Sequence, residues 1–430
     1  MSARLERLFR ADYVKNNERE SYMAEKNIAT KIGPLQGLRI IDLSTVVLGP
    51  YASQFLAEYG AEVIKIEALE GDSTRRIGPQ TESGMASLFM SVNRNKRSVA
   101  IDLKQREGRE TLLALIGTAD VFMHNMRPQK IAKLGLDPTT LTALNPRLIY
   151  AGLHGFSENG LYAGRPAYDD IIQGLCGMAA LMEMQSGIPG YLPTVLADKV
   201  ASLIGVQAIL AAVVERARTN KGVVVEVPMF ESLVSFGLVE HLYGGQFDPP
   251  QDQVGYMRVL MPYRRPYATL DSYLCIMPYS DEHWHTFLSA VNDSEALKDP
   301  RFASLSLRTK NIDALYQRLS EHVRTRTTND WLRLCQDLDI PAAPMNRLED
   351  LQNDPHLMSV GHFQKVHDPQ MGTLVFPANP VRFNDWQPTA QVPPRLGADT
   401  VEVLRENGFD DEQIAVLVSL NVITRELVSV

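Results

Sequence analysis

A carboxylate beside a long apolar run is the feature of this sequence with the clearest chemical potential. Asp198 precedes the run from Ala201 to Val214, and Gly222 follows where a helix would be expected to stop. The pattern predicts a buried helix with Asp198 in its first turn. A helix N-terminus offers free N–H groups and a positive dipole end, so the carboxylate is expected to stay ionised and could act as a nucleophile. It could equally be an ordinary N-cap, and the local pattern alone favours the cap.

A second candidate lies upstream, where Asp169 and Asp170 are adjacent. Because neighbouring residues point in different directions, they make a poor acid–base pair. Asp169 is nevertheless the next candidate nucleophile if Asp198 proves to be only a cap.

A short basic turn, Asn93–Ser98, contains Arg94 and Arg97. Most runs of this kind are solvated loops. The functional alternative is a phosphate clamp, in which several Lys and Arg donors converge on one anion. Three more cations could join such a clamp: Arg75, Arg76 and Lys104.

Apolar strand-like and helix-like segments alternate through the first half of the chain, which predicts a doubly wound α/β domain with a parallel sheet. The expected strands are 38–43, 61–67, 97–103, 119–124 and 147–153, and the expected helices are 50–60, 107–116, 128–134 and 138–144. Asn125 and Met126 stand where a strand ends and a helix opens, the usual place for a ligand in this fold class.

The pattern changes after Val227. The stretch 249–266 is rich in Pro, Gly and Tyr and predicts a linker into a smaller α+β module. A strand is expected at 269–277, with helices at 281–291 and 315–338, and a helix-rich tail at 400–430.

Composition excludes several classes of function. The net charge of −8 argues against a general nucleic-acid binder, and the three distant cysteines form no disulfide or zinc pattern. The longest apolar stretch, residues 201–214, is too short to span a bilayer, so no membrane contact is expected and a reducing cytoplasm fits best. The nine histidines form no metal-binding pattern. Neither a GxGxxG nor a GxxxxGK[ST] motif occurs, which argues against dinucleotide and NTP cofactors.

Several long motifs in the same order make this chain similar to the class III CoA-transferase family, the group with formyl-CoA transferase, carnitine-CoA transferase and α-methylacyl-CoA racemase. The stretches that carry the resemblance are LRIIDLSTVVLGPYASQFLAEYGAEVIKIE (38–67), NRNKRSVAIDLK (93–104), ADVFMHNMRP (119–128), NPRLIYAGLHGF (145–156) and PAYDDIIQ (166–173).

The resemblance implies a Rossmann-like large domain formed by both chain ends, with a smaller α+β domain inserted between them. It also implies a homodimer of interlocked rings. We expect an N-terminal leader at 1–33, the first part of the large domain at 34–227, the linker and small domain at 228–350, and a return to the large domain at 351–430.

The implied reaction moves CoA from an acyl-CoA thioester to a small, possibly dicarboxylic, acid. The family's nucleophilic aspartate is matched to Asp198, whose carboxylate would attack the thioester and form an anhydride and then an aspartyl-CoA thioester. The CoA thioester is a substrate, and no permanently bound cofactor or metal is implied.

The CoA contacts implied by the resemblance are spread over the first half of the chain. They are Val47 and Leu48 in the first loop, Ile101 and Lys104 near the adenine and phosphates, and Asn125, Met126 and Lys133, alongside the basic-turn candidates Arg94 and Arg97. Val47 replaces the glutamine of the formyl-CoA relatives, which puts a polar contact to a formyl-sized acyl group in doubt.

Two alternatives remain. A racemase needs bases on both faces of the α-carbon, and Tyr168 stands where the racemase branch has a histidine. The third interpretation, a non-catalytic CoA-binding subunit, would require Asp198 to be missing or buried in a salt bridge.

Overall fold

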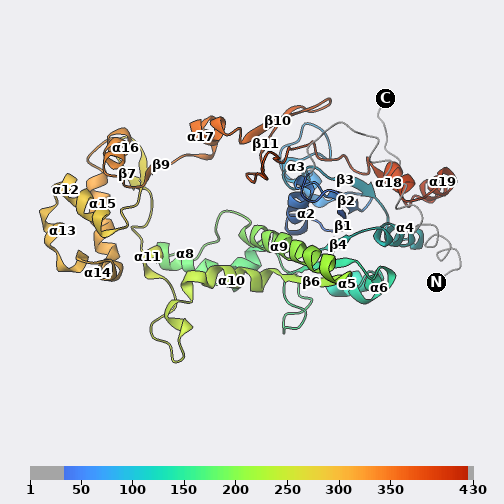
Figure 1. The fold of residues 1–430 in the computed structure, drawn as a ribbon, viewed down its shortest axis with the longest axis horizontal. Coiled ribbons are helices and arrows are strands. Elements are labelled where there is room, and N and C mark those ends of the chain that lie inside the picture. The colour runs from blue at the N-terminus through green and yellow to red at the C-terminus, as the bar shows by residue number, and fades with distance from the viewer. Residues whose placement is uncertain (1–32, 425–430) are drawn as a thin grey trace.

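The computed structural model describes residues 33–424, and the predicted leader at 1–33 lies outside this range except for Gly33. The molecule is elongated, with a large lobe that holds the central sheet and a smaller lobe at the opposite end (Figure 1).

The large lobe is built on a six-stranded parallel sheet with the order β3-β2-β1-β4-β5-β6, which confirms the predicted α/β class. Its strands are β1 (Arg39–Asp42), β2 (Glu62–Glu67), β3 (Arg97–Ala100), β4 (Val121–His124), β5 (Ile149–His154) and β6 (Val223–Pro228). The strand order reverses between β1 and β4, so ligands are expected beside the carboxyl ends of these two strands.

Helices cover both faces of the sheet because alternate strand residues face opposite sides. Ile40 and Val63 belong to one apolar core, whereas Ile41 and Ile64 belong to the other. The first core contains residues of α2 (Leu48–Glu58), α7 (Asp169–Leu175), α8 (Met178–Ser186), α9 (Leu196–Thr219) and α10 (Met229–His241). The second contains residues of α4 (Arg106–Gly117), α5 (Pro128–Lys133), α6 (Pro138–Leu144), α18 (Thr400–Glu406) and α19 (Asp411–Ser419).

Helix α9 is longer than the apolar run that predicted it. By length and composition this 24-residue helix could cross a membrane, with a mean hydropathy of 1.7 in its best window. Core helices of globular proteins pass the same test, and α9 packs against α2, α10 and strands β5 and β6. Helix α9 therefore extends beyond the predicted apolar run at both ends, and its packing makes it part of the cover of the sheet.

The smaller lobe has its own core around Phe287 and Trp331. Its elements are the antiparallel strands β7 (Tyr267–Ala268), β8 (Tyr273–Ile276) and β9 (Ala342–Pro344) and the helices α12 (Asp281–Ala290), α13 (Ser294–Lys298), α14 (Leu305–Lys310), α15 (Ile312–Val323) and α16 (Thr328–Asp337). The single helix expected at 315–338 is two helices, because Thr327 caps a new helix through its side chain. The strand expected at 269–277 is instead the turn and second strand of the β7–β8 hairpin.

The chain passes between the lobes twice (Figure 1). The outward path runs through α10 and α11 (Met257–Leu260), and the return path runs from β9 through α17 (Pro355–Ser359) to the hairpin of β10 (Phe363–Asp368) and β11 (Gly372–Pro377). Helix α18 then packs against β3, so residues near the C-terminus complete the large lobe.

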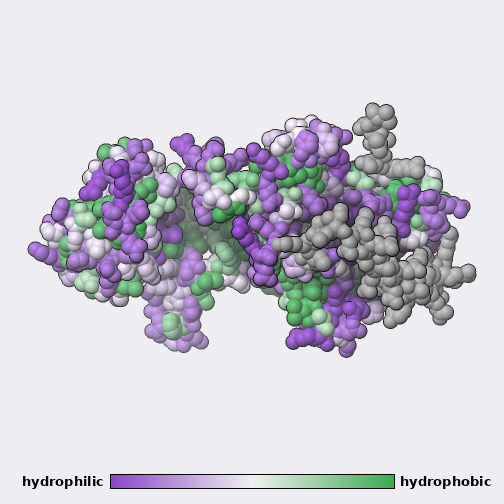
Figure 2. Space-filling view, turned by 45° about the horizontal axis from the view of Figure 1, so that its top comes forward, coloured by the Kyte–Doolittle hydropathy of each residue, from purple (hydrophilic) through white to green (hydrophobic). Residues whose placement is uncertain are grey.

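Apolar side chains remain exposed on the helices between the lobes, and Figure 2 shows apolar surface in the hollow there. On α9 and α10 they include Leu203, Val214, Phe236 and Val239, the last with 74% of its surface exposed. Contiguous apolar surface of this kind is typical of a protein–protein contact.

Candidate active site

The loops that follow β1 and β4 are joined by one side chain. The Asn125 amide accepts a hydrogen bond from the Thr45 N–H (3.0 Å) and donates one to the Thr45 carbonyl (2.7 Å). Asn125 and Met126 therefore lie at the strand-order reversal, as predicted. Because the Asn125 side chain is committed to Thr45, the neighbouring backbone is the part left to meet a ligand.

Asp169, in the first turn of α7, caps the N-terminus of α9 across 28 residues of sequence. Its Oδ1 accepts hydrogen bonds from the N–H groups of Ala197 (2.7 Å) and Asp198 (3.2 Å), and its Oδ2 accepts one from Gln173 Nε2 (2.6 Å). Gln173 stands one turn further along α7 and is itself held by the loop before α9, where it donates to the Thr194 carbonyl (3.1 Å). Asp169 is thus a buried, oriented acceptor.

Asp198 occupies the first turn of α9 as predicted, but it is not the cap. The N-cap position belongs to Val195, and no side-chain capping bond is made there. Burial, together with the negative charge of Asp169, raises the pKa of Asp198 to about 7. The helix end therefore does not hold the pKa of Asp198 at its ordinary value, and the N–H groups of Ala197 and Asp198 donate to Asp169 instead.

The Asp169–Asp198 pair has no cation paired with either carboxylate among the described residues. Lys199 is adjacent to Asp198 in sequence, but its ammonium donates to Thr194 Oγ1 (2.6 Å). Asp170 is exposed, whereas its neighbour Asp169 is buried.

The basic turn is arranged differently from a phosphate clamp. Arg94 is buried in an ion pair with Glu58 (2.8 Å), and Arg97 pairs with Glu62 (3.1 Å) and with Glu406 (2.6 Å). Arg75, which might have joined the clamp, is buried against Glu67 (2.6 Å). These arginines already satisfy carboxylates of the protein itself, which argues against Arg94 and Arg97 as phosphate ligands.

The remaining predicted CoA contacts differ in accessibility. The side chain of Ile101 is fully buried, and its backbone pairs with Ile423, so no side-chain contact with a ligand is open to it. Val47 and Leu48 are buried at the start of α2, at the sheet edge beside Asn125. Lys104 and Lys133 are exposed.

Sequence reasoning missed two histidines at this edge. His124 ends β4 and His154 ends β5, with ring centroids 5.5 Å apart. Burial lowers the pKa of His124 to about 3, and its Nε2 lies 2.7 Å from the Tyr150 hydroxyl. The Nδ1 atoms of both rings are buried without a hydrogen-bond partner within residues 33–424. The only available signal was their position at the ends of two apolar strands.

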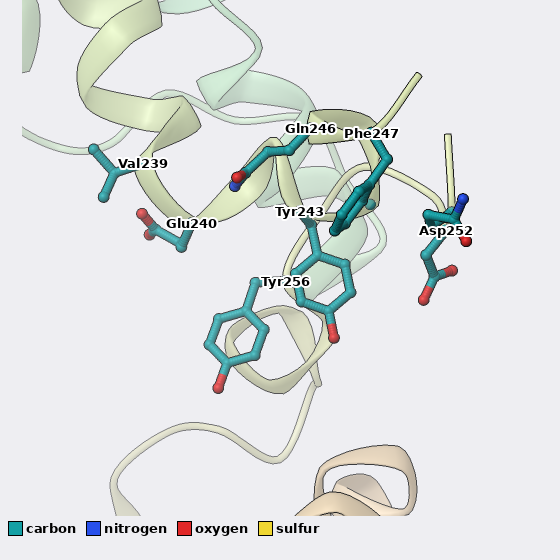
Figure 3. A pocket seen from close by; sticks show the side chains of 9 residues that line it. Val239, Glu240, Tyr243, Gln246, Phe247, Asp252 and Tyr256 are labelled. Atoms are coloured by element: carbon teal, nitrogen blue, oxygen red, sulfur yellow. The ribbon is translucent and has the colours of Figure 1, made fainter. Parts of the chain in front are cut away.

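A separate cavity lies at the C-terminal end of α10. Figure 3 shows Tyr243, Phe247 and Tyr256 around it, and its volume is about 580 Å³. The Tyr243 and Tyr256 rings are stacked with centroids 5.8 Å apart. None of the predicted site residues lines this cavity.

The fold places the chain among α/β proteins with a central parallel sheet. A family model described as CoA-transferase family III matches residues 35–400, and the chain belongs to this family. It is accordingly a CoA-transferase that acts on acyl-CoA thioesters and carboxylic acids.

Individual relatives agree with this placement. The chain is 32% identical to an acyl-CoA transferase of Fusarium pseudograminearum over 91% of this chain and 89% of the relative. It is 28% identical to the succinyl-CoA:glutarate CoA-transferase of Homo sapiens, over 91% and 90%. Among solved structures, a CAIB/BAIF family protein from Brucella suis is similar with a TM-score of 0.74 and 30% identity, over 88% of this chain and all of that one.

Proposed function

We propose that the protein transfers CoA through a covalent aspartyl intermediate formed at the Asp169–Asp198 pair. The observation that carries the proposal is a pair of carboxylates without a cation, beside the first loop of a CoA-transferase fold. The carboxylate oxygen attacks the thioester carbonyl, the C–S bond breaks, and CoA leaves as a thiolate. The thiolate then attacks the aspartyl carbonyl and releases the donor acid, and an acceptor carboxylate takes the CoA by the reverse steps.

The geometry favours Asp169 as the attacking residue, rather than Asp198 as the sequence suggested. The carboxylate of Asp169 is oriented by two backbone N–H bonds and one amide bond. Asp198 has no such donors, and the charge of Asp169 makes its ionisation harder. Asp198 then serves as the neutral neighbour that hydrogen-bonds to substrate.

A trapping experiment separates the two assignments. Wild-type protein is incubated with an acyl-CoA and no acceptor, and then treated with hydroxylamine, which converts an activated carboxyl into a hydroxamate. Peptide mass spectrometry should find the hydroxamate on Asp169. A hydroxamate on Asp198 would return the nucleophile to the residue predicted from sequence, and the absence of any modification would overturn the covalent mechanism.

For the acceptor we propose a dicarboxylic acid. Relatives include the succinyl-CoA:glutarate enzyme and the formyl-CoA:oxalate CoA-transferase of Escherichia coli, with 26% identity over 89% of this chain. A panel of acyl-CoAs and mono- and dicarboxylic acids, read for new thioesters by mass spectrometry, tests this. Racemisation of a 2-methylacyl-CoA without acceptor would favour the racemase alternative, but Tyr168 is 72% exposed and lies outside the buried pair.

We also propose a homodimer of interlocked rings. The two connections between the lobes close the chain into a ring, and α10, which carries exposed apolar side chains, runs along one of them. Separating such a dimer requires partial unfolding, so native mass spectrometry at nanomolar concentration should still detect dimer. Monomer produced by simple dilution would contradict the proposal.

A further inference from the structure

The loop between β1 and α2 contains a valine in a conformation that valine rarely adopts. Val46 has φ +69°, in the left-handed region. A β-branched side chain clashes with the backbone there, so the conformation persists only where the surroundings impose it. The other non-glycine residues with positive φ in the described chain, Tyr243 apart, are Asn or Asp, which tolerate this region.

A buried ion pair imposes the conformation. Both oxygens of Asp72 face the Val46 N–H, at 3.4 and 3.2 Å. Asp72 is only 3% exposed and is held by the Lys65 ammonium at 3.0 Å. The same ammonium donates to the Ser44 carbonyl at 2.9 Å, so the Lys65–Asp72 pair holds the loop on both sides of Thr45.

The other end of the loop is fastened to the helix that carries Asp198. Ser202, one turn along α9, has its hydroxyl 2.6 Å from the Leu48 carbonyl and 2.6 Å from the Asp198 carbonyl. The path of residues 46–48 is therefore fixed relative to the turn that contains Asp198. A small rotation at Val46 would move Val47 and Leu48, the loop residues matched to substrate contact.

We propose that Asp72, with Lys65, is a positioning residue for CoA transfer, which keeps Val46 left-handed so that Val47 and Leu48 stay aligned with the aspartate pair. The inference rests on the proposed function. Valine at position 46 has fewer accessible backbone conformations than glycine would have. The Lys65–Asp72 ion pair holds Val46 in the left-handed conformation, which valine would otherwise avoid. The loop is thereby stiff as well as correctly directed, which matters because misplacement of about 1 Å can cost on the order of 100-fold in rate.

The test compares Asp72→Asn, Val46→Gly and the double variant. Asp72→Asn weakens the hydrogen bond that the Val46 N–H donates to residue 72. The loop should then shift, and kcat/KM should fall about 100-fold. Glycine adopts a positive φ at no steric cost, so adding Val46→Gly to Asp72→Asn should restore about tenfold of that loss. The melting temperature should not recover, because the Lys65 charge remains unpaired in both variants.

Val47→Gly is the matched control, since it adds the same backbone freedom at the next residue, where φ is −120°. Combined with Asp72→Asn it should give no recovery. If Asp72→Asn does not fold, Lys65→Met/Asp72→Asn replaces it, because this pair removes both charges together.

The outcomes separate this inference from the proposed function. If the wild type shows no CoA transfer, the proposed function fails. If the wild type is active and Val46→Gly gives no recovery in the Asp72→Asn background, or recovers melting temperature and activity together, Asp72 has only a structural role and the positioning inference is overturned.

Discussion

Two groups of carboxylates near the same edge of the sheet differ in whether a cation is paired with them. On the β1–β2–β3 side every one of them has a cation: Asp42 meets Lys96 at 3.4 Å, Asp72 meets Lys65, and Glu67 meets Arg75. On the side of α7 and α9, Asp169 accepts hydrogen bonds from neutral donors, and no cation within residues 33–424 pairs with Asp169 or Asp198.

The difference is visible in the pKa values. Burial alone would raise the pKa of Asp42, but Lys96, Lys65 and two serine hydroxyls outweigh it and lower the pKa. Nothing offsets burial at Asp198, and its pKa rises to about 7. Pairing makes a buried carboxylate an unreactive part of the framework, whereas the unpaired carboxylates remain available for chemistry.

The largest effect on the rate of CoA transfer is expected from neutralising Asp169 or Asp198, the carboxylates without a paired cation. Asp169→Asn retains an oxygen for the N–H groups of α9, so the variant should fold and dimerise. It should lose CoA transfer by about 1,000-fold or more, because the attacking oxygen anion is gone. Asp198→Asn should lose about 10- to 100-fold, the usual size of a lost positioning or proton-holding contribution.

Rates of single-turnover thioester formation measure this comparison, with circular dichroism and dimer content as controls. A larger loss in Asp198→Asn than in Asp169→Asn would reverse the two roles.

Neutralising a carboxylate that has a buried cation partner should instead reduce the stability of the fold. Glu67→Gln leaves Arg75 buried without its counter-charge, which typically costs about 3–5 kcal/mol and should lower the melting temperature by several degrees. Adding Arg75→Met should recover part of the loss, because it removes the unpaired charge. Arg106→Gln is the control: its pair with Glu110 lies on the surface, where such contacts contribute little. Equal melting temperatures for Glu67→Gln and the wild type would show that the buried pair is not structural.

The sheet could be predicted from sequence because its strands are local apolar runs separated by helices with recognisable ends. Helix α6 occupies the predicted residues, Pro138–Leu144, and starts with a proline after an aspartate cap. The break between α15 and α16 was missed because both sides of it continue a helical pattern, and only Thr327 signals a new start.

The site was less predictable because its electrostatics depend on contacts between distant residues. The cap of α9 comes from Asp169, and Arg97 is paired with Glu406, which lies 309 positions away. A local pattern shows a basic turn and a carboxylate near a helix start, but it does not show which charges are already paired. Asp198 was placed correctly in the first helical turn, while its ionisation was judged from the helix alone.

The pH dependence of stability should also distinguish the two groups. Asp198 keeps its proton to about pH 7 in the folded state, whereas an unfolded aspartate loses it near pH 4. Between these values the folded state binds more protons, so the contribution of Asp198 to stability falls as pH rises, and it is constant above pH 7. Asp198→Asn removes this trend and should gain on the order of 1–3 kcal/mol relative to wild type between pH 4.5 and pH 8.

Denaturant unfolding at several pH values measures this gain. Asp170→Asn, which changes the exposed neighbour of Asp169, is the matched control and should show no such trend. If the difference in unfolding free energy between Asp198→Asn and the wild type does not change with pH, the pKa of Asp198 is not raised in the folded state.

The smallest effect concerns the cations. Lys104 is exposed and forms no ion pair with a carboxylate among the described residues, unlike Arg94 and Arg97, so it is free to meet a phosphate of CoA. Losing a charge-assisted contact costs about 1–3 kcal/mol, so Lys104→Ala should raise the KM for acyl-CoA about tenfold while changing kcat and the KM for the acid by less than about twofold. Lys298→Ala, an exposed lysine of the smaller lobe, should leave all three constants unchanged. An unaltered KM for acyl-CoA in Lys104→Ala would show that Lys104 does not contact the CoA phosphates. Other groups would then have to bind the phosphates, and the exposed Lys133 would be the next residue to test.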